Sequence, residues 1–346
     1  MKMNVKNIFV LSLCLLLAVA ASAQNQLNRI DAKGKKQGPW KKYENGILIY
    51  EGQFENDVPQ GTFRYYFPNG KLKSVSEFVA GVSKVKTVTY HPNGNRASEG
   101  IFIDQQKDGQ WKYYSDKNVL LSEENYKLGK KNGLFVTYGV GGNKLKQEHY
   151  VNDVLDGECV SFFENEDPFV VQHYINGKLN GEMISYYPGK VVAQKGVYYN
   201  NLKTGVWELN DKEGKIRKTE EYGKPGRVSK IYLYVYANGN PQKINQDLVA
   251  YFIKKGETRT SIMLKNANRL EATESLIKIL EWVDMLEFLR VTPNLYAASS
   301  CIKGYKDIDA TTVKVNLKPA LDYEVEAQDN DAMFIRSLFN TEVPKE

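Results

Sequence analysis

The chain has 346 residues, with 47 Lys or Arg against 41 Asp or Glu, which gives a formal net charge of +6. The charges of both signs are interspersed and do not gather into basic arms, so no nucleic-acid partner is indicated. Three cysteines are too few for a disulfide framework, and we expect stability to come mainly from packing.

Residues 1–23 have the pattern of a secretory signal peptide. Two lysines precede the apolar run IFVLSLCLLLAVA, and Ala-Ser-Ala at 21–23 forms an A-x-A cleavage site. The mature chain is therefore expected to begin near Gln24 and to be exported, in a periplasmic or extracellular location. Cys14 lies inside the apolar run, so no lipid anchor is expected. No later segment has the roughly 20 apolar residues of a membrane-spanning helix.

Glycines recur with a period of 24 residues after a lead-in of residues 24–36. These positions, called the lead glycines below, are Gly38, Gly61, Gly109, Gly133, Gly157, Gly181 and Gly205. The first step is 23 residues, and Val85 stands where one further glycine is expected. Internal repetition of this kind predicts a repeat architecture.

Two columns of aromatic residues follow the same period. The first ring column, five residues after each lead position, is Tyr43, Tyr66, Tyr90, Tyr114, Tyr138, Phe162 and Tyr186, with Asn210 in the last repeat. The second ring column has no gap and comprises Phe54, Phe78, Phe102, Tyr126, Tyr150, Tyr174, Tyr198 and Tyr222. Together the columns define eight repeats over residues 37–226.

Each repeat contains two turn signals. An Asn-Gly or related sequence lies between the ring columns, as in ENG at 44–46 and PNG at 68–70. Residues that accept a left-handed backbone follow the second ring, namely Asp57, Gly81, Gly129, Asp153, Gly177 and Asn201. Each repeat is therefore predicted to be strand, turn, strand, turn. Because Trp111 and Tyr114 are three residues apart, either a bulge lies near the glycine or both sheet faces carry rings.

The fold class predicted for residues 37–226 is an elongated β meander. A single hairpin is only marginally stable in water, and 24 residues cannot close a core of their own. Eight stacked hairpins can cover one another, so their stability becomes a sum of nearest-neighbour terms. The ring columns are expected to form the spine of this stack.

The repeat pattern G-x-W-x-x-Y-x-x-N-G-x-L…E-x-x-Y-x-N-G-x-x-x-G resembles the MORN-variant repeats of bacterial exported proteins, often grouped with a YwqK-like antitoxin family. The resemblance covers more than half the chain and implies a rod of stacked β-hairpins with a scaffolding or membrane-proximal binding role. The sequence departs from the pattern at 85–90, at Cys159 and Met183 in the Trp position, and at 164–169. These repeats keep their rings, so the fold is expected to persist there.

Residues 227–346 are predicted to form a separate α+β domain. The segment GKPGRVS at 223–229 is interpreted as a hinge, and IYLYVY at 231–236 as a strand that adds a ninth half-repeat. A further strand is expected in LVAYFIKK. Apolar residues at helical spacing predict a helix over 268–290.

A hairpin is predicted over residues 312–327, TVKVNLKPALDYEVEA. The side chains expected to face the core are Val313, Val315, Leu317, Leu321, Tyr323 and Val325. Lysines and acidic residues alternate with them and can pair across the two strands.

The sequence offers little catalytic chemistry. His91, His149 and His173 all lie in the repeats, so no Ser-His-Asp triad and no histidine-activated Cys301 can form within residues 227–346. His149 and His173 share one repeat position, which places them about 9–10 Å apart on alternate strands and does not favour a zinc site. We predict no cofactor, no metal and no enzyme. A pair of carboxylates for glycoside hydrolysis stays open, because its separation depends on the fold.

Binding by exposed tyrosines is the remaining chemistry. The candidates for partner contact are Tyr65, Tyr113, Tyr187, Tyr232, Tyr234 and Tyr236. Alternatively, these rings cover the second face of the sheet. The sequence favours an exported, non-enzymatic scaffold that binds a protein or a cell-envelope component. The alternatives are a rigid spacer with binding in the C-terminal domain, a hydrolase with its site in that domain, and an antitoxin or immunity-type inhibitor.

Overall fold

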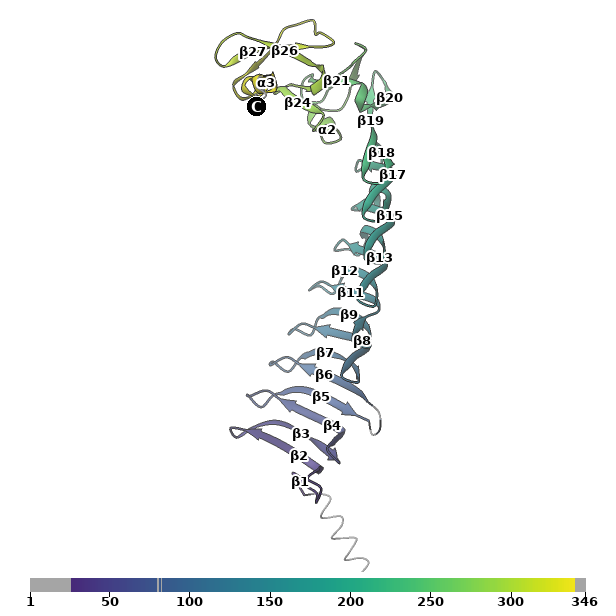
Figure 1. Cartoon of the computed structure of the whole chain (residues 1–346), viewed down its shortest axis with the longest axis vertical. Coiled ribbons are helices and arrows are strands. Elements are labelled where there is room, and N and C mark those ends of the chain that lie inside the picture. Colours follow the sequence, from purple (N-terminus) through teal and green to yellow (C-terminus); the bar gives the residue numbers. More distant parts are fainter. Residues whose placement is uncertain (1–25, 80, 82, 340–346) are drawn as a thin grey trace, which may run out of the picture. The chain divides into compact units, whose positions relative to one another are not determined.

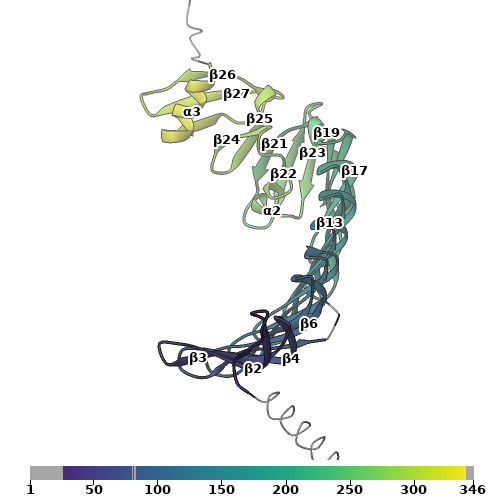
Figure 2. The same ribbon diagram turned by 60° about the horizontal axis from the view of Figure 1, so that its bottom comes forward.

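The computed structural model describes residues 26–339 except 80 and 82. The predicted signal peptide lies outside this range. The chain divides into two units, Met1–Lys178 and Leu179–Glu346. Figures 1 and 2 show the first unit as successive hairpins and draw helices α2 and α3 in the second unit. Among the described residues, no helix has the length and apolar character needed to cross a membrane.

The first unit is a meander of hairpins. Its strands are β1 (Arg29–Ile30), β2 (Lys36–Glu44), β3 (Ile47–Glu55), β4 (Val58–Tyr66), β5 (Leu72–Phe78), β6 (Lys84–Tyr90), β7 (Arg96–Ile103), β8 (Gln106–Tyr114), β9 (Leu120–Lys127), β10 (Lys130–Lys131), β11 (Gly133–Tyr138), β12 (Lys144–Val151), β13 (Val154–Phe162) and β14 (Pro168–Ile175). Neighbours in sequence pair antiparallel, and β9 pairs with both β10 and β11. The predicted mainly β, hairpin-repeat fold is confirmed.

The turns form where the sequence predicts them. After the first hairpin, Asn56 and Asp57 have φ of 52° and 69°, and Asn152 and Asp153 have 49° and 71°. Two consecutive positive φ values are the signature of a tight turn that matches the twist of the paired strands. Asn, Asp and Gly occupy most of these positions because they accept that backbone at low cost.

Gly61, Gly109, Gly157 and Gly205 each lie at a bulge within a strand. Gly61 has φ of 63° and pairs with Phe78 of the second ring column. On its other side the pairing jumps from Glu51↔Arg64 to Gln53↔Gln60, so one residue of β3 faces three of β4. The same relation holds at Gly109, which has φ of 69° and pairs with Tyr126.

The bulge settles how the rings are distributed between the two faces of the sheet. Trp111 and Tyr113 lie on one face with their ring centroids 6.2 Å apart. Tyr114 lies on the opposite face, where its hydroxyl donates to Glu99 at 2.8 Å. Both alternatives left open by the sequence are therefore present, a bulge at the glycine and rings on both faces. The face of Trp111 is called the ring face below.

The second unit adds hairpins and a compact α+β region. Its strands are β15 (Lys178–Tyr187), β16 (Val191–Tyr199), β17 (Leu202–Asn210), β18 (Ile216–Lys224), β19 (Arg227–Ala237), β20 (Asn240–Asn245), β21 (Val249–Lys254), β22 (Thr260–Leu264), β23 (Arg269–Ala272), β24 (Phe288–Thr292), β25 (Leu295–Ala298), β26 (Ile302–Asp307), β27 (Thr312–Leu317) and β28 (Val325–Gln328). Its helices are η1 (Gln246–Leu248), α2 (Leu276–Leu280), η2 (Ser299–Cys301) and α3 (Asp329–Phe339). Figure 2 shows α3 beside β26 and β27.

The segment 223–229 is a hairpin turn and not a hinge. Lys224 of β18 pairs with Arg227 of β19, and Gly226 has φ of 74°. The ladder then continues to Lys218↔Leu233, so β19 extends the repeat sheet as the predicted ninth half-repeat. Glycine and proline signal a turn without telling whether the flanking strands pair. The domain boundary at 226 stays a prediction.

The predicted helix over 268–290 is wrong. Strand β23, the five-residue helix α2 and strand β24 occupy this segment instead. Leu270 pairs with Ile262 of β22, and Leu289 pairs with Ala297 of β25. The spacing of the apolar residues suggested a helix, but the same residues lie in strands that pair with distant parts of the chain. Local periodicity cannot reveal such pairing. Ser275 caps α2 by accepting from the Lys278 amide at 3.4 Å.

The predicted hairpin 312–327 forms as β27 and β28, with Val313 opposite Ala327 and Val315 opposite Val325. Val313 is fully buried, and Lys314 forms an ion pair with Glu324, which lies just before β28. Tyr323 differs from the prediction because it is 47% exposed. It lies in the irregular connection before β28, where inward and outward positions no longer alternate.

Candidate functional site

One row of side chains crosses the ring face of the first unit, strand after strand. We call it the central row, and its members from β2 to β14 are Trp40, Gly52, Phe63, Ser76, Thr87, Gly100, Trp111, Glu124, Phe135, Glu148, Cys159 and Gln172. Consecutive members pair directly, as in Trp40↔Gly52, Phe63↔Ser76 and Ser76↔Thr87, or meet at a lead-glycine bulge. In most repeats, the central-row residue on the first strand is bulky, and the central-row residue on the strand before it is small or polar.

Bulky members of the central row lie between rings of the second ring column. Phe63 packs edge-on against Phe54 and Phe78, with both centroid distances at 5.1 Å. Phe135 packs in the same way between Tyr126 at 5.5 Å and Tyr150 at 4.9 Å. Edge-to-face packing at these distances is the favoured arrangement of aromatic pairs.

Glycine in the central row makes room for the ring on the next strand. A side chain at Gly52 would place its Cβ 2.5 Å from the ring of Phe63, and one at Gly100 would overlap Trp111. Trp111 is 3% exposed, and its indole nitrogen donates to the Ile101 carbonyl at 3.1 Å. A buried ring and a glycine eleven residues earlier therefore form one packing unit.

The third repeat lacks this packing unit. Thr87 occupies the bulky position and Ser76 the glycine position, and their hydroxyls lie 3.1 Å apart. With Gly100 next in the row, three small residues separate Phe63 from Trp111. The bulky ring that would separate Phe78 from Phe102 is missing here.

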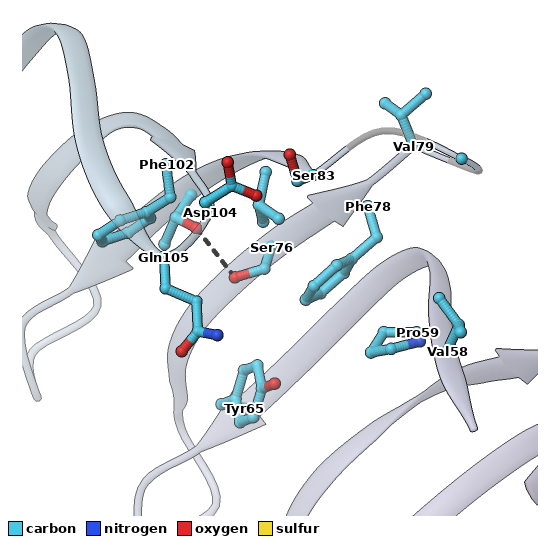
Figure 3. Close-up of a pocket in the computed structure, with 13 residues that line it drawn as sticks. Val58, Pro59, Tyr65, Ser76, Phe78, Val79, Ser83, Phe102, Asp104 and Gln105 are labelled. Carbon is cyan, nitrogen blue, oxygen red and sulfur yellow. Dashed lines mark hydrogen bonds between the residues drawn. The ribbon is translucent and has the colours of Figure 1, made fainter. Parts of the chain in front are cut away.

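A recess of about 720 Å³ opens at this gap. Figure 3 shows Phe78 and Phe102 on opposite sides of the Ser76–Thr87 hydrogen bond. The lining residues are Val58, Pro59, Tyr65, Ser76, Phe78, Val79, Gly81, Ser83, Val85, Thr87, Phe102, Asp104 and Gln105. The walls are mainly apolar and the floor is two hydroxyls, a combination typical of ligand sites.

The electrostatics of the recess also differ from those of its neighbours. In the next two repeats a lysine lies over the rings, with the Lys107 ammonium 5.1 Å from the Trp111 centroid and the Lys131 ammonium 5.0 Å from that of Phe135. Ser83 occupies the equivalent position, two residues before Val85. Asp104 is the charged residue among those lining the recess.

Two of the tyrosines singled out in the sequence lie on the ring face. Tyr65 lines the recess and packs 5.7 Å from Tyr50, and burial raises the pKa of its hydroxyl. Tyr113 stacks on Trp111, and its hydroxyl accepts from the Lys107 ammonium. The structure therefore puts Tyr65 at a ligand-sized recess and gives Tyr113 a packing role. Their contact with a partner stays a prediction.

The other four predicted tyrosines lie in the second unit. The Tyr187 hydroxyl donates to the Asn210 carbonyl at 3.1 Å. Tyr232 and Tyr234 lie beneath the Lys243 ammonium, at 4.1 Å and 5.7 Å from their centroids. Tyr236 is 45% exposed. The role of these four in binding stays a prediction.

Sequence reasoning missed the residues that build the recess. Ser76 and Thr87 have no chemical signature of a site, and Phe78 and Phe102 belong to a column assigned to structure. The available signal was the departure at 85–90, where glycine and tryptophan are replaced. We expected the fold to persist there, and it does. The replacement also puts the small Thr87 where other repeats have a large ring, and the space that the ring would fill stays open as a cavity.

Reactive side chains are dispersed through the molecule. The His149 Nδ1 atom lies 2.6 Å from the Asp156 carbonyl, and His173 lies 3.7 Å from Glu158. Cys301 is 4% exposed within the core of the second unit. In the part of the chain that the structure describes, no three His, Cys, Asp or Glu side chains lie close enough to hold a metal ion.

Comparison with known proteins supports the repeat assignment. Residues 59–80 and 107–128 match the family described as MORN repeat variant. The first match contains Ser76 and Phe78 of the recess, and the second contains Trp111. The search of curated proteins found no match.

A likeness to a much larger solved structure is weak. The crystal structure of TcdB2-TccC3-Cdc42 shares 12% sequence identity over 68% of this chain, with a TM-score of 0.14. The chain spans 16% of the length of that protein.

Proposed function

We propose that the protein is an exported, non-enzymatic scaffold whose hairpin repeats bind a protein partner in the cell envelope. Three observations support this proposal. Residues 1–23 have the pattern of a signal peptide, two segments match MORN repeat variants, and the ring face carries a ligand-sized recess.

The observation that carries the proposal is the recess in the third repeat. Phe78 and Phe102 build its walls. On the side away from the recess, Phe78 contacts the buried ring of Phe63 and Phe102 contacts that of Trp111. When a ligand covers such exposed apolar surface, the complex is stabilised by about 25 cal/mol for each Å² removed from water. The lining offers hydroxyls, an amide and one carboxylate, so recognition is the activity that it supports best.

Site-specific photocrosslinking in cells tests this proposal. The full chain would carry a photoreactive phenylalanine at Tyr65, beside the recess, or at Tyr236 in the second unit as a comparison position. We expect a discrete protein adduct in the exported fraction from the Tyr65 position. Adducts from Tyr236 alone would favour the spacer alternative, in which the C-terminal region binds. The absence of adducts at both positions, together with hydrolysis of a generic ester or glycoside, would contradict the scaffold.

A further inference from the structure

The recess lies where the neighbouring repeats place an internal ring. We propose that it receives one aromatic side chain from an extended segment of the partner protein, with an adjacent Lys or Arg of that segment facing Asp104. This inference rests on the scaffold function proposed above and names the chemistry that the recess selects.

The geometry of the neighbouring repeats defines what fits. Phe63 fills the space between Phe54 and Phe78, and Phe135 fills the space between Tyr126 and Tyr150. An aromatic side chain from outside that entered between Phe78 and Phe102 would meet two ring edges in the same arrangement. An aliphatic side chain would cover the same walls without the edge-to-face contacts, each worth about 0.5–1.5 kcal/mol.

The floor of the recess adds a polar requirement. Ser76 and Thr87 are each 8% exposed, and their hydroxyls bond to each other. The oxygen of either hydroxyl can accept one more hydrogen bond. An indole N–H or a phenol O–H can donate to them, much as the internal Trp111 donates to a carbonyl. Tryptophan and tyrosine are thus better matched to this floor than phenylalanine.

The charge of the rim favours a basic neighbour. In the fourth and fifth repeats the chain supplies its own cation over the rings, from Lys107 and Lys131. The third repeat has Ser83 at that position and Asp104 on the rim, as Figure 3 shows. A lysine or arginine beside the incoming ring would replace the absent ammonium and pair with the Asp104 carboxylate.

The size of the recess indicates a chain segment rather than a single free ring. Its volume of about 720 Å³ exceeds one aromatic side chain and leaves room for the residues next to it. The lining also extends beyond the two rings to Val58 and Pro59 on one side and Gln105 on the other.

Restoring the repeat packing provides the sharpest test. The double variant Ser76→Gly, Thr87→Trp copies the pairs Gly52–Phe63 and Gly100–Trp111 and should place an internal ring between Phe78 and Phe102. Because it follows the packing of its neighbours, it is expected to fold and to melt at the same or a higher temperature than the natural chain. The single variant Tyr43→Trp, which adds a tryptophan at an exposed position outside the recess, is the matched control.

The probe is a fluorescein-labelled seven-residue peptide with one central Trp between two Lys residues, measured by fluorescence polarisation with residues 24–346. We expect saturable binding that weakens at least about 10-fold when the Trp is replaced by Ala or when the recess is filled. Tyr43→Trp should bind within about 2-fold of the natural chain. Replacing the flanking Lys by Glu should weaken binding about 3-fold or more, and Asp104→Asn should remove most of that difference.

Two results would overturn the inference. One is a filled variant, shown by circular dichroism to be folded, that binds the Trp peptide as tightly as the natural chain. The other is equal binding of the Trp and Ala peptides. Crosslinking from Tyr65 separates this failure from failure of the scaffold function. If the filled variant still gives the discrete protein adduct, the protein is a scaffold but the recess does not receive an aromatic side chain. If the natural chain gives the adduct and the filled variant does not, both proposals are supported.

Discussion

Among single residues, the buried rings of the central row should contribute most to the free energy of unfolding. Trp111 is 3% exposed, contacts Phe102 at 4.8 Å and donates a hydrogen bond, whereas Tyr43 of the first ring column is 53% exposed. We expect Trp111→Ala to cost about 3–5 kcal/mol in the free energy of unfolding and Tyr43→Ala less than about 1 kcal/mol. Urea unfolding of both variants checks this. Equal losses would show that the ring face is not the main source of stability.

Glu220 should make the second unit sensitive to acid. Burial opposes ionisation of its carboxyl, but Lys218 at 2.8 Å, Lys203 at 3.2 Å and the Tyr222 hydroxyl at 2.8 Å outweigh it and lower the pKa to about 2. A lowered folded-state pKa stabilises the fold above the unfolded value of 4.5, and this contribution is lost as pH falls from about 4.5 to 2. The shift corresponds to about 3 kcal/mol at neutral pH.

The measurement is the melting temperature from pH 7 to pH 2 for the natural chain and for Glu220→Gln. The variant should melt lower at pH 7 and lose less stability on acidification. Glu213→Gln is the control, because Glu213 lies in an exposed turn of the same unit. Parallel pH curves for the natural chain and Glu220→Gln would contradict the assignment.

At the level of the hairpin, two kinds of glycine should respond differently to substitution. Gly109 has a positive φ and open space around its Cβ position, whereas Gly100 has no room beneath the Trp111 ring. Gly109→Asn should therefore cost less than about 1 kcal/mol, since Asn tolerates the left-handed region, and Gly109→Ala about 1–2 kcal/mol. Gly100→Ala should cost more than either, because the ring must move. Thermal unfolding ranks the three variants, and a harmless Gly100→Ala would refute the packing unit.

Arg217 connects the repeat strand β18 to the compact region within the second unit. It pairs with Asp211 at 2.7 Å and with the mostly buried Glu274 at 3.0 Å, and its guanidinium lies 5.4 Å from the Trp282 ring. Arg217→Met should cost about 3 kcal/mol, because Glu274 loses its cation while remaining buried. Hydrogen exchange should then speed up in β23 and α2 and stay unchanged in β12. Uniform acceleration in all three elements would argue against a local connection.

For the whole molecule, an elongated solution shape is the prediction from the sequence. Repeats that contact only their neighbours lengthen with each addition instead of becoming compact. Small-angle scattering of residues 24–346 should give an extended pair-distance distribution, and a compact profile would contradict the stacked arrangement. Export is tested separately by fractionation, with a chain lacking residues 1–23 expected to stay in the cytoplasm.

Sequence alone determined the hairpin repeats because their signals are local. Gly61 and Asp57 specify backbone conformations within one repeat, and the 24-residue spacing of Phe54 and Phe78 records the stacking directly. The pairing of β22 with β23 could not be predicted, since Ile262 meets Leu270 only in the folded chain and the local spacing of Leu270 resembles a helix.

The candidate site was decided by tertiary structure. Replacement of a ring by Thr87 is visible in the sequence, but its effect depends on which side chains share a face after a bulge. Only the fold places Ser76, Thr87 and Gly100 consecutively in one row and leaves Phe78 and Phe102 without a ring between them. The recurring residues thus predict the architecture, whereas the cavity forms in the repeat that lacks a recurring residue, because the remaining side chains do not fill the space.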